Sequence, residues 1–110
     1  MFKDKTILIT GAASGLGRAW AQGFSADGAT VIAADINGEG LGEVPAALRI
    51  TLDVSKADDV ERMIATTVKQ TGRIDILFNN AGLGFSKRLE NSEPGDFEQH
   101  VAVHLFAMVN

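Results

Sequence analysis

Three glycines near the start of the chain have the spacing of a turn that could hold a phosphate group. Gly11, Gly15 and Gly17 follow the apolar run Ile-Leu-Ile that ends at residue 9. Gly11 allows a sharp turn out of a strand, Gly15 lacks the Cβ that would hold a phosphate away, and Gly17 permits close packing of the next helix. The first N–H groups of that helix have no partner within it and could donate to an anion. The pattern predicts a nucleotide-binding turn.

An acidic residue follows at a distance that suits a ribose. Asp35 lies 18 residues after Gly17, where a carboxylate can accept hydrogen bonds from the hydroxyl groups of an adenosine ribose. A 2′-phosphate would meet this carboxylate, and Ser14, Ile36 and Asn37 offer no cation to offset it. The sequence therefore favours NAD over NADP. The alternative is a solvated aspartate at the end of a strand.

Two further polar segments end predicted strands. Asp53-Val54 follows one strand, and Asn79-Asn80-Ala81-Gly82 follows the next. The small residues Ala81 and Gly82 allow close approach of a ligand, and asparagine amides can bond backbone groups of neighbouring strand ends. Taken alone, the second segment is equally consistent with a polar turn.

These residues need a sheet that brings the strand ends together. Hydrophobic patterns and turn signals predict strands at Lys5–Thr10, Thr30–Asp35, Leu48–Val54 and Ile74–Phe78, and helices at Gly15–Asp27, from Ser55 to Gly72, and from Ser92 or Glu93 to Asn110. The first helix should place Leu16, Ala19, Trp20, Gly23 and Phe24 on one face. The alternation indicates an α/β fold with a parallel sheet and right-handed crossovers.

Details of the helices follow from single residues. The crossover from Ile36 to Ala47 is rich in glycine and should hold at most one helical turn. Ser55 should cap the second helix, with Asp58 completing a capping box. Its buried stripe should be Val60, Met63, Ile64 and Val68, and the last helix, with Pro94 in its first turn, should share a face of Phe97, Val101, His104, Leu105 and Met108.

Together these motifs resemble the short-chain dehydrogenase/reductase family. The resemblance rests on Thr10-Gly11-x-x-x-Gly15-x-Gly17, Asp35, Asp53-Val54 and Asn79-Asn80-Ala81-Gly82, and it spans essentially the whole chain. It implies a Rossmann-like doubly wound parallel sheet with strand order 3-2-1-4. It also implies that Ser14 and Leu16 help to hold the pyrophosphate, that Asp53 and Val54 flank the adenine, and that Asn80, Ala81 and Gly82 line the ribose.

The resemblance also implies a reaction, and the chain lacks part of the machinery for it. The family moves a hydride between nicotinamide and a small alcohol or ketone, with a tyrosinate as general base, a lysine that lowers its pKa, and a serine. This chain contains no tyrosine. We therefore expect residues 1–110 to be an incomplete NAD-binding Rossmann domain, the N-terminal part of a longer fold, and inactive alone. The predicted strand at residues 74–78 would be an uncovered apolar edge, so the chain should self-associate or be completed by more polypeptide.

A histidine occupies a position where the family has a catalytic asparagine. Alignment of residues 97–105 places His104 there, where an imidazole could serve a proton relay. Packing of the same histidine within the helix is an equal alternative. His100 lies nearly opposite, and without a third ligand we expect no metal site.

Composition limits the partners. The net charge is −4 with no basic run, which argues against nucleic acid. No segment is long and apolar enough for a membrane span, and there is no cysteine. We expect a cytoplasmic protein that forms a homo-oligomer when complete. A non-catalytic NAD-binding module is the main alternative, and a methyltransferase is a third, which the glycine spacing and Asn-Asn-Ala-Gly disfavour.

Overall fold

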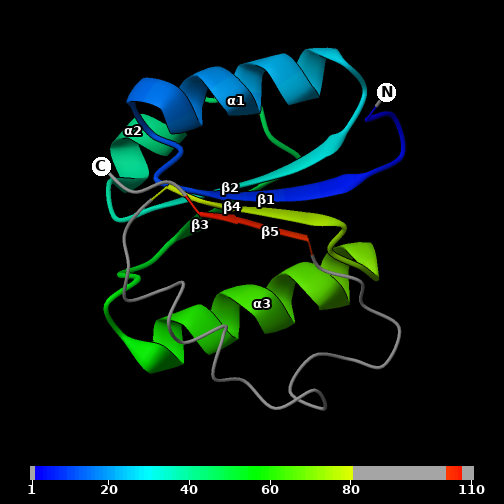
Figure 1. The fold of residues 1–110 in the computed structure, drawn as a ribbon. Coiled ribbons are helices and arrows are strands. Elements are labelled where there is room, and N and C mark those ends of the chain that lie inside the picture. The colour runs from blue at the N-terminus through cyan, green and yellow to red at the C-terminus, as the bar shows by residue number, and fades with distance from the viewer. Residues whose placement is uncertain (1, 81–103, 108–110) are drawn as a thin grey trace.

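The structure is a computed structural model that describes residues 2–80 and 104–107. Within these residues one parallel sheet has the strand order β3-β2-β1-β4-β5 (Figure 1). The strands are β1 (Thr6–Thr10), β2 (Thr30–Asp35), β3 (Leu48–Thr51), β4 (Ile76–Asn79) and β5 (His104–Ala107), and the helices are α1 (Gly15–Ala26), α2 (Gly38–Leu41) and α3 (Ala57–Thr71). The predicted α/β fold and the order 3-2-1-4 are confirmed.

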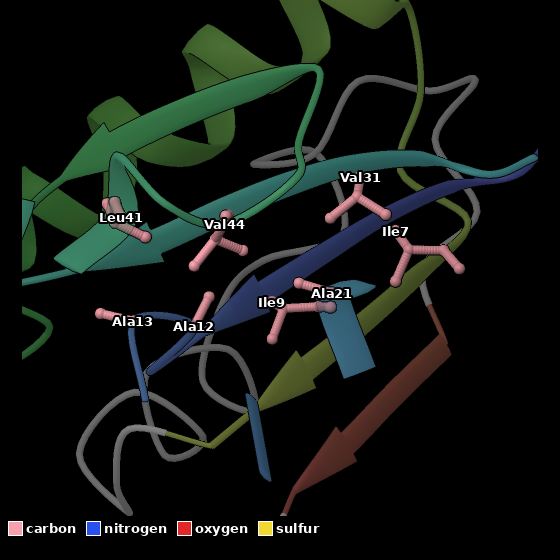
Figure 2. Packing of buried hydrophobic residues seen from close by; sticks show 9 residues of the cluster. Ile7, Ile9, Ala12, Ala13, Ala21, Val31, Leu41 and Val44 are labelled. Atoms are coloured by element: carbon pink, nitrogen blue, oxygen red, sulfur yellow. The ribbon is translucent and has the colours of Figure 1, made fainter. Parts of the chain in front are cut away.

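Helices cover both faces of the sheet, so its central strand is buried along its whole length. All five residues of β1 are buried, as expected for a parallel strand between two layers. Ile7 and Ile9 point to the face that α1 and α2 cover, where they pack with Ala21 and Leu41 (Figure 2). Leu8 belongs to the other cluster, which packs against α3 on the opposite face (Figure 1).

Helix α1 buries a face that is rotated from the predicted one. Gly17 and Ala21 are buried, and Trp20 and Phe24 pack against the same cluster. Leu16, Ala19 and Gly23 are exposed, so the predicted face is only in part the one that packs on the sheet. The small size of the buried residues explains the error: Gly17 and Ala21 allow close approach to the sheet and contribute little to a hydrophobic pattern.

The crossover between β2 and β3 contains a single helical turn, α2, as predicted. Asn37 caps it, because its Oδ1 accepts a hydrogen bond from Gly40 N at 3.1 Å. Gly40 packs against the glycine turn, where a Cβ would lie 3.0 Å from the Cβ of Ala13. Arg49 of β3 secures the end of the crossover by donating from Nη2 to Val44 O at 2.7 Å.

Helix α3 begins later than predicted, and the predicted capping box is wrong. Its N-cap is Lys56, which makes no side-chain capping bond. Ser55 instead donates its hydroxyl to Asp53. A serine bonds whichever nearby acceptor the backbone brings closest, and here that acceptor precedes the helix. The predicted end is confirmed, since Gly72 is left-handed with φ of 82°.

The buried side of α3 agrees with the predicted stripe in part. Val60 and Met63 are buried, whereas Ile64 and Val68 are partly buried against the same cluster. Thr67 completes the buried face, and its hydroxyl is satisfied by donation to Met63 O at 2.8 Å. A threonine can therefore be buried at a position where the pattern calls for an aliphatic residue.

The last predicted helix is wrong at residues 104–107, which form β5. This strand pairs in parallel with β4, with His104 opposite Ile76 and Ala107 opposite Asn79. A short apolar run suits either conformation, and pairing with β4 satisfies backbone groups that an open edge would leave unpaired. The prediction that β4 is an uncovered edge is therefore wrong too. The remainder of that helix, including Phe97, lies outside the described residues.

Candidate functional site

The glycine turn joins β1 to α1 at the carboxyl edge of the sheet. Gly11 and Gly15 have φ of 66° and 57°, in the left-handed region that favours glycine. Ser14 is the N-cap of α1, and its side chain makes no capping hydrogen bond. Ser14, Gly15 and Leu16 are exposed, and nothing lies within 4 Å of a Cβ built on Gly15. The start of α1 thus has open space beside Gly15.

Gly17 is held against two other parts of the site. A Cβ at this position would overlap Gly11 O and would lie 2.9 Å from Asn80 Nδ2. The sequence predicted close packing of α1 on the sheet at this glycine, and the structure identifies the neighbouring atoms. Gly17 lets the first turn of α1 rest on the glycine turn and on the end of β4.

Asn80 ties the end of β4 to the glycine turn. Its backbone N donates to Thr10 Oγ1 at 3.1 Å, and its side-chain Nδ2 donates to Gly11 O at 3.4 Å. Thr10 is fully buried, and its hydroxyl also donates to Phe78 O at 3.5 Å. The predicted bonding of an asparagine amide to a neighbouring strand end is confirmed for Asn80. Ala81 and Gly82 lie outside the described residues.

Asp35 supports the turn from the other side. Its Oδ2 accepts a hydrogen bond from Ala13 N at 2.9 Å, and its Oδ1 accepts one from Asn37 N at 2.9 Å. An ionised carboxylate has about four acceptor positions, so capacity remains for further donors. The sequence predicted Asp35 as a ribose ligand, and it did not predict this bracing role. No local signal reveals it, because Ala13 is 22 residues away.

Asp53 and Val54 follow β3 at the same edge of the sheet. Leu52 N donates to Asp35 O at 3.0 Å, which links this segment to β2. Asp53 Oδ1 accepts from Ser55 Oγ at 2.6 Å and from Ser55 N at 2.9 Å. The Ser55 hydroxyl, followed by the Ser55 backbone N–H, lowers the pKa of Asp53 below its ordinary value. Val54 is half-buried and packs against the α3-side cluster.

Most of the predicted site is therefore assembled in one place. The glycine turn, Asp35 and Asn80 are in direct contact through hydrogen bonds. His104 is not brought to them, because β5 places its backbone opposite Ile76, at the amino end of β4. At about 3.3 Å per residue, it lies roughly 10 Å along the strand from the level of Asn79.

Other kinds of site find no support in the described part of the chain. No group of three or more histidine, cysteine, aspartate and glutamate residues within 2–80 and 104–107 could hold a metal ion. Among the same residues, no helix has both the length and the apolar character that a membrane crossing requires.

Known proteins share both the sequence and the fold. A model of the short chain dehydrogenase family matches residues 5–110. An oxidoreductase of Mycobacterium bovis, itself uncharacterised, is 40% identical over 112 residues, covering 96% of this chain and 45% of that protein. Tropinone reductase-like 1 of Erythroxylum coca is 41% identical over 113 residues, covering 94% of this chain and 41% of that protein.

A solved structure agrees. The 3-ketoacyl-(acyl-carrier-protein) reductase from Brucella melitensis, crystallised with NADH, is 36% identical with a TM-score of 0.70, over 76% of this chain and 36% of that one. The chain thus spans less than half the length of the relatives named here. On its sequence and its fold, the chain belongs to the short-chain dehydrogenase/reductase family.

Proposed function

We propose that this chain binds NAD, in preference to NADP, as the cofactor-binding part of an oxidoreductase acting on a small alcohol or ketone. The observation that carries the proposal is the closed arrangement of the glycine turn, in which Gly17 contacts Gly11 and Asn80 while Gly15 stays open. A side chain at Gly17 would collide with Gly11 O and Asn80 Nδ2, whereas the open space beside Gly15 could hold a pyrophosphate. The Brucella relative was crystallised with NADH, which supports the same cofactor here.

The start of α1 supplies the phosphate contacts in this proposal. Ser14, Gly15 and Leu16 are exposed at the end of the helix that carries the positive dipole. Since the Ser14 side chain makes no capping bond, it does not compete for the first N–H groups of the helix. These groups would bind the pyrophosphate of the cofactor.

Two carboxylates would recognise the adenosine. Asp35 accepts hydrogen bonds from two backbone N–H groups and has acceptor positions left for the ribose hydroxyls. The same charge would repel a 2′-phosphate. Asp53 and Val54 would flank the adenine, and the hydrogen bonds from Ser55 that lower the pKa of Asp53 also hold its carboxylate in place. Asn80, Ala81 and Gly82 would line the ribose on the nicotinamide side.

The bound nicotinamide would supply the site that accepts or donates the hydride. The residues described here bind and orient the cofactor, and none of the 110 is a tyrosine that could serve as the family's general base. We therefore propose that residues 1–110 bind the cofactor without turnover and belong to a longer, cytoplasmic, oligomeric enzyme.

Titration with dinucleotides tests the proposal. The change in Trp20 fluorescence on adding NADH or NADPH gives both dissociation constants, and Trp20 is the only tryptophan in the chain. Repulsion of like charges should make NADH binding at least about tenfold tighter. Asp35→Asn keeps an acceptor oxygen and removes the charge, so it should lower the ratio of the NADPH dissociation constant to the NADH dissociation constant. Asp58→Asn, which makes the same charge change on α3, should leave the ratio unchanged.

Three results would contradict this function. The first is tighter binding of NADPH than of NADH. The second is the same ratio of the two dissociation constants in Asp35→Asn as in Asp58→Asn. The third is no binding of either dinucleotide. Binding of S-adenosylmethionine in their place would indicate a methyltransferase.

A further inference from the structure

The first turn of α3 carries two adjacent carboxylates with different surroundings. Asp58 is exposed, whereas the Asp59 side chain is only 28% exposed. Asp59 Oδ2 accepts a hydrogen bond from Asp53 N at 2.9 Å, and Asp59 Oδ1 lies 3.6 Å from Arg62 Nη2. Acidic residues in the first turn of a helix usually stabilise it only through their interaction with the helix dipole. Asp59 also reaches back to the segment that follows β3.

This bond completes the fixation of Asp53. The carbonyl of Asp53 accepts from Lys56 N at 3.0 Å, and its Oδ1 accepts from Ser55. Both of these partners belong to the same short turn. Asp59 satisfies the remaining backbone group, the N–H of Asp53, and does so from within α3. The turn is thereby attached to a helix that packs against the sheet through Val60 and Met63.

The position of this turn matters for the site. Leu52, the residue before Asp53, donates its N–H to Asp35 O, so the two strand ends share a hydrogen bond. A shift of Asp53 would move it relative to Asp35 and to the glycine turn that Asp35 braces. A carboxylate is a strong acceptor for a backbone N–H and fixes its direction as well as its distance.

We infer that Asp59 is a positioning residue for nucleotide recognition: by holding Asp53 N, it sets the geometry with which Asp53-Val54 reads the adenine base. This inference rests on the proposed function and extends it to a residue outside the sequence motifs. Asp59 acts through Asp53 and touches no ligand itself. Its loss should therefore affect discrimination between bases more than the binding of phosphate.

Base discrimination gives the measurement. The amino group of adenine can donate to the Asp53 carboxylate, whereas hypoxanthine presents a carbonyl oxygen at the same place. We expect the wild-type chain to bind NADH more tightly than reduced nicotinamide hypoxanthine dinucleotide. Asp59→Ala should reduce this preference about tenfold, the effect of losing one charge-assisted hydrogen bond.

Matched variants separate positioning from general stability. Asp59→Asn retains an oxygen that can accept from Asp53 N, so it should restore most of the preference. Asp58→Ala removes a charge from the same helical turn and should leave the preference unchanged. Asp59→Glu keeps the charge and displaces the carboxylate by one methylene, so it carries the test if Asp59→Ala does not fold.

Amide hydrogen exchange at Asp53, measured by NMR without ligand, gives an independent readout. Asp59→Ala should accelerate this exchange at least about tenfold relative to Asp58→Ala, because a protected N–H loses its acceptor. An unchanged preference in Asp59→Ala and Asp59→Glu, or unchanged exchange at Asp53, would overturn the inference alone. Failure of the wild-type chain to bind NADH would overturn the proposed function, and this inference with it.

Discussion

Replacing Gly17 by alanine tests whether the glycine turn is packed as the structure shows. The added Cβ would overlap Gly11 O and approach Asn80 Nδ2 to 2.9 Å. Gly11 O is a backbone atom, so relief requires movement of the turn or of the helix. Overpacking of this kind costs about 3 kcal/mol at the upper end of the usual range. The better helix propensity of alanine returns about 1 kcal/mol, which leaves a net loss of about 2 kcal/mol.

The same helix provides the matched control. Gly23 also lies in α1, and nothing is within 4 Å of a Cβ built on it. Gly23→Ala should therefore stabilise the protein by up to about 1 kcal/mol. At about 4 °C per kcal/mol for a chain of this size, the two variants should differ in Tm by about 12 °C.

Thermal and urea denaturation measure the difference. Far-UV circular dichroism follows the helices. Trp20 fluorescence follows the packing of α1 on β4, since the centroids of the Trp20 and Phe78 rings are 4.7 Å apart. The mutation sites flank Trp20 by three residues on either side, so the probe is equally close to both. A Gly17→Ala variant that melts within about 2 °C of Gly23→Ala would refute the packing argument.

Two further substitutions test the connections between strands β1 and β4. Asp75 accepts from Thr6 N at 2.8 Å and from Arg73 Nη2 at 2.6 Å; burial opposes its ionisation, but these bonds outweigh it, so its pKa lies below the ordinary 3.8. The stabilisation by the ionised Asp75 is present above the ordinary pKa and is lost as pH falls through the lower folded-state value. In Asp75→Asn, the free energy of unfolding should therefore fall less steeply with pH below about pH 4. Urea denaturation at several pH values measures this, and an equally steep fall in the variant and the wild type would contradict the prediction. Thr10→Val removes the acceptor of Asn80 N and should lower the free energy of unfolding by about 1–3 kcal/mol. Thr10→Ser keeps the hydroxyl and should lower it less. Chemical denaturation that shows Thr10→Val to be more stable than Thr10→Ser would refute this prediction.

Local patterns predicted the order of elements as far as β4 and the positions of the principal candidate site residues. Strand β2 has the predicted bounds, and the glycine turn and Asp35 lie at the carboxyl edge as the spacing required. These predictions succeed because hydrophobic periodicity and glycine placement are properties of contiguous residues. The same reasoning limited the crossover to a loop with at most one helical turn.

The errors concern interactions that depend on the path of the backbone or on distant residues. Ser55 was expected to cap α3, but Asp53 is its partner, and Asp59 reaches across the turn to Asp53 N. Which of several nearby polar groups a side chain selects depends on the path of the backbone. Residues 104–107 form a strand because β4 offers an edge. The bracing of Ala13 by Asp35 likewise required the sheet to be assembled first.

The hydrogen bonds of Asn80 have a consequence for the folding of the chain. The segment β1, α1 and β2 is contiguous, whereas Asn80 bonds to residues that precede it by 69 and 70 positions. The turn is thus finished only when a loop of that length has closed, at an entropic cost that rises slowly with its length. A ligand that requires the finished turn is linked to this closure. Its binding free energy would accordingly oppose unfolding of the whole sheet as well as ordering the residues it touches.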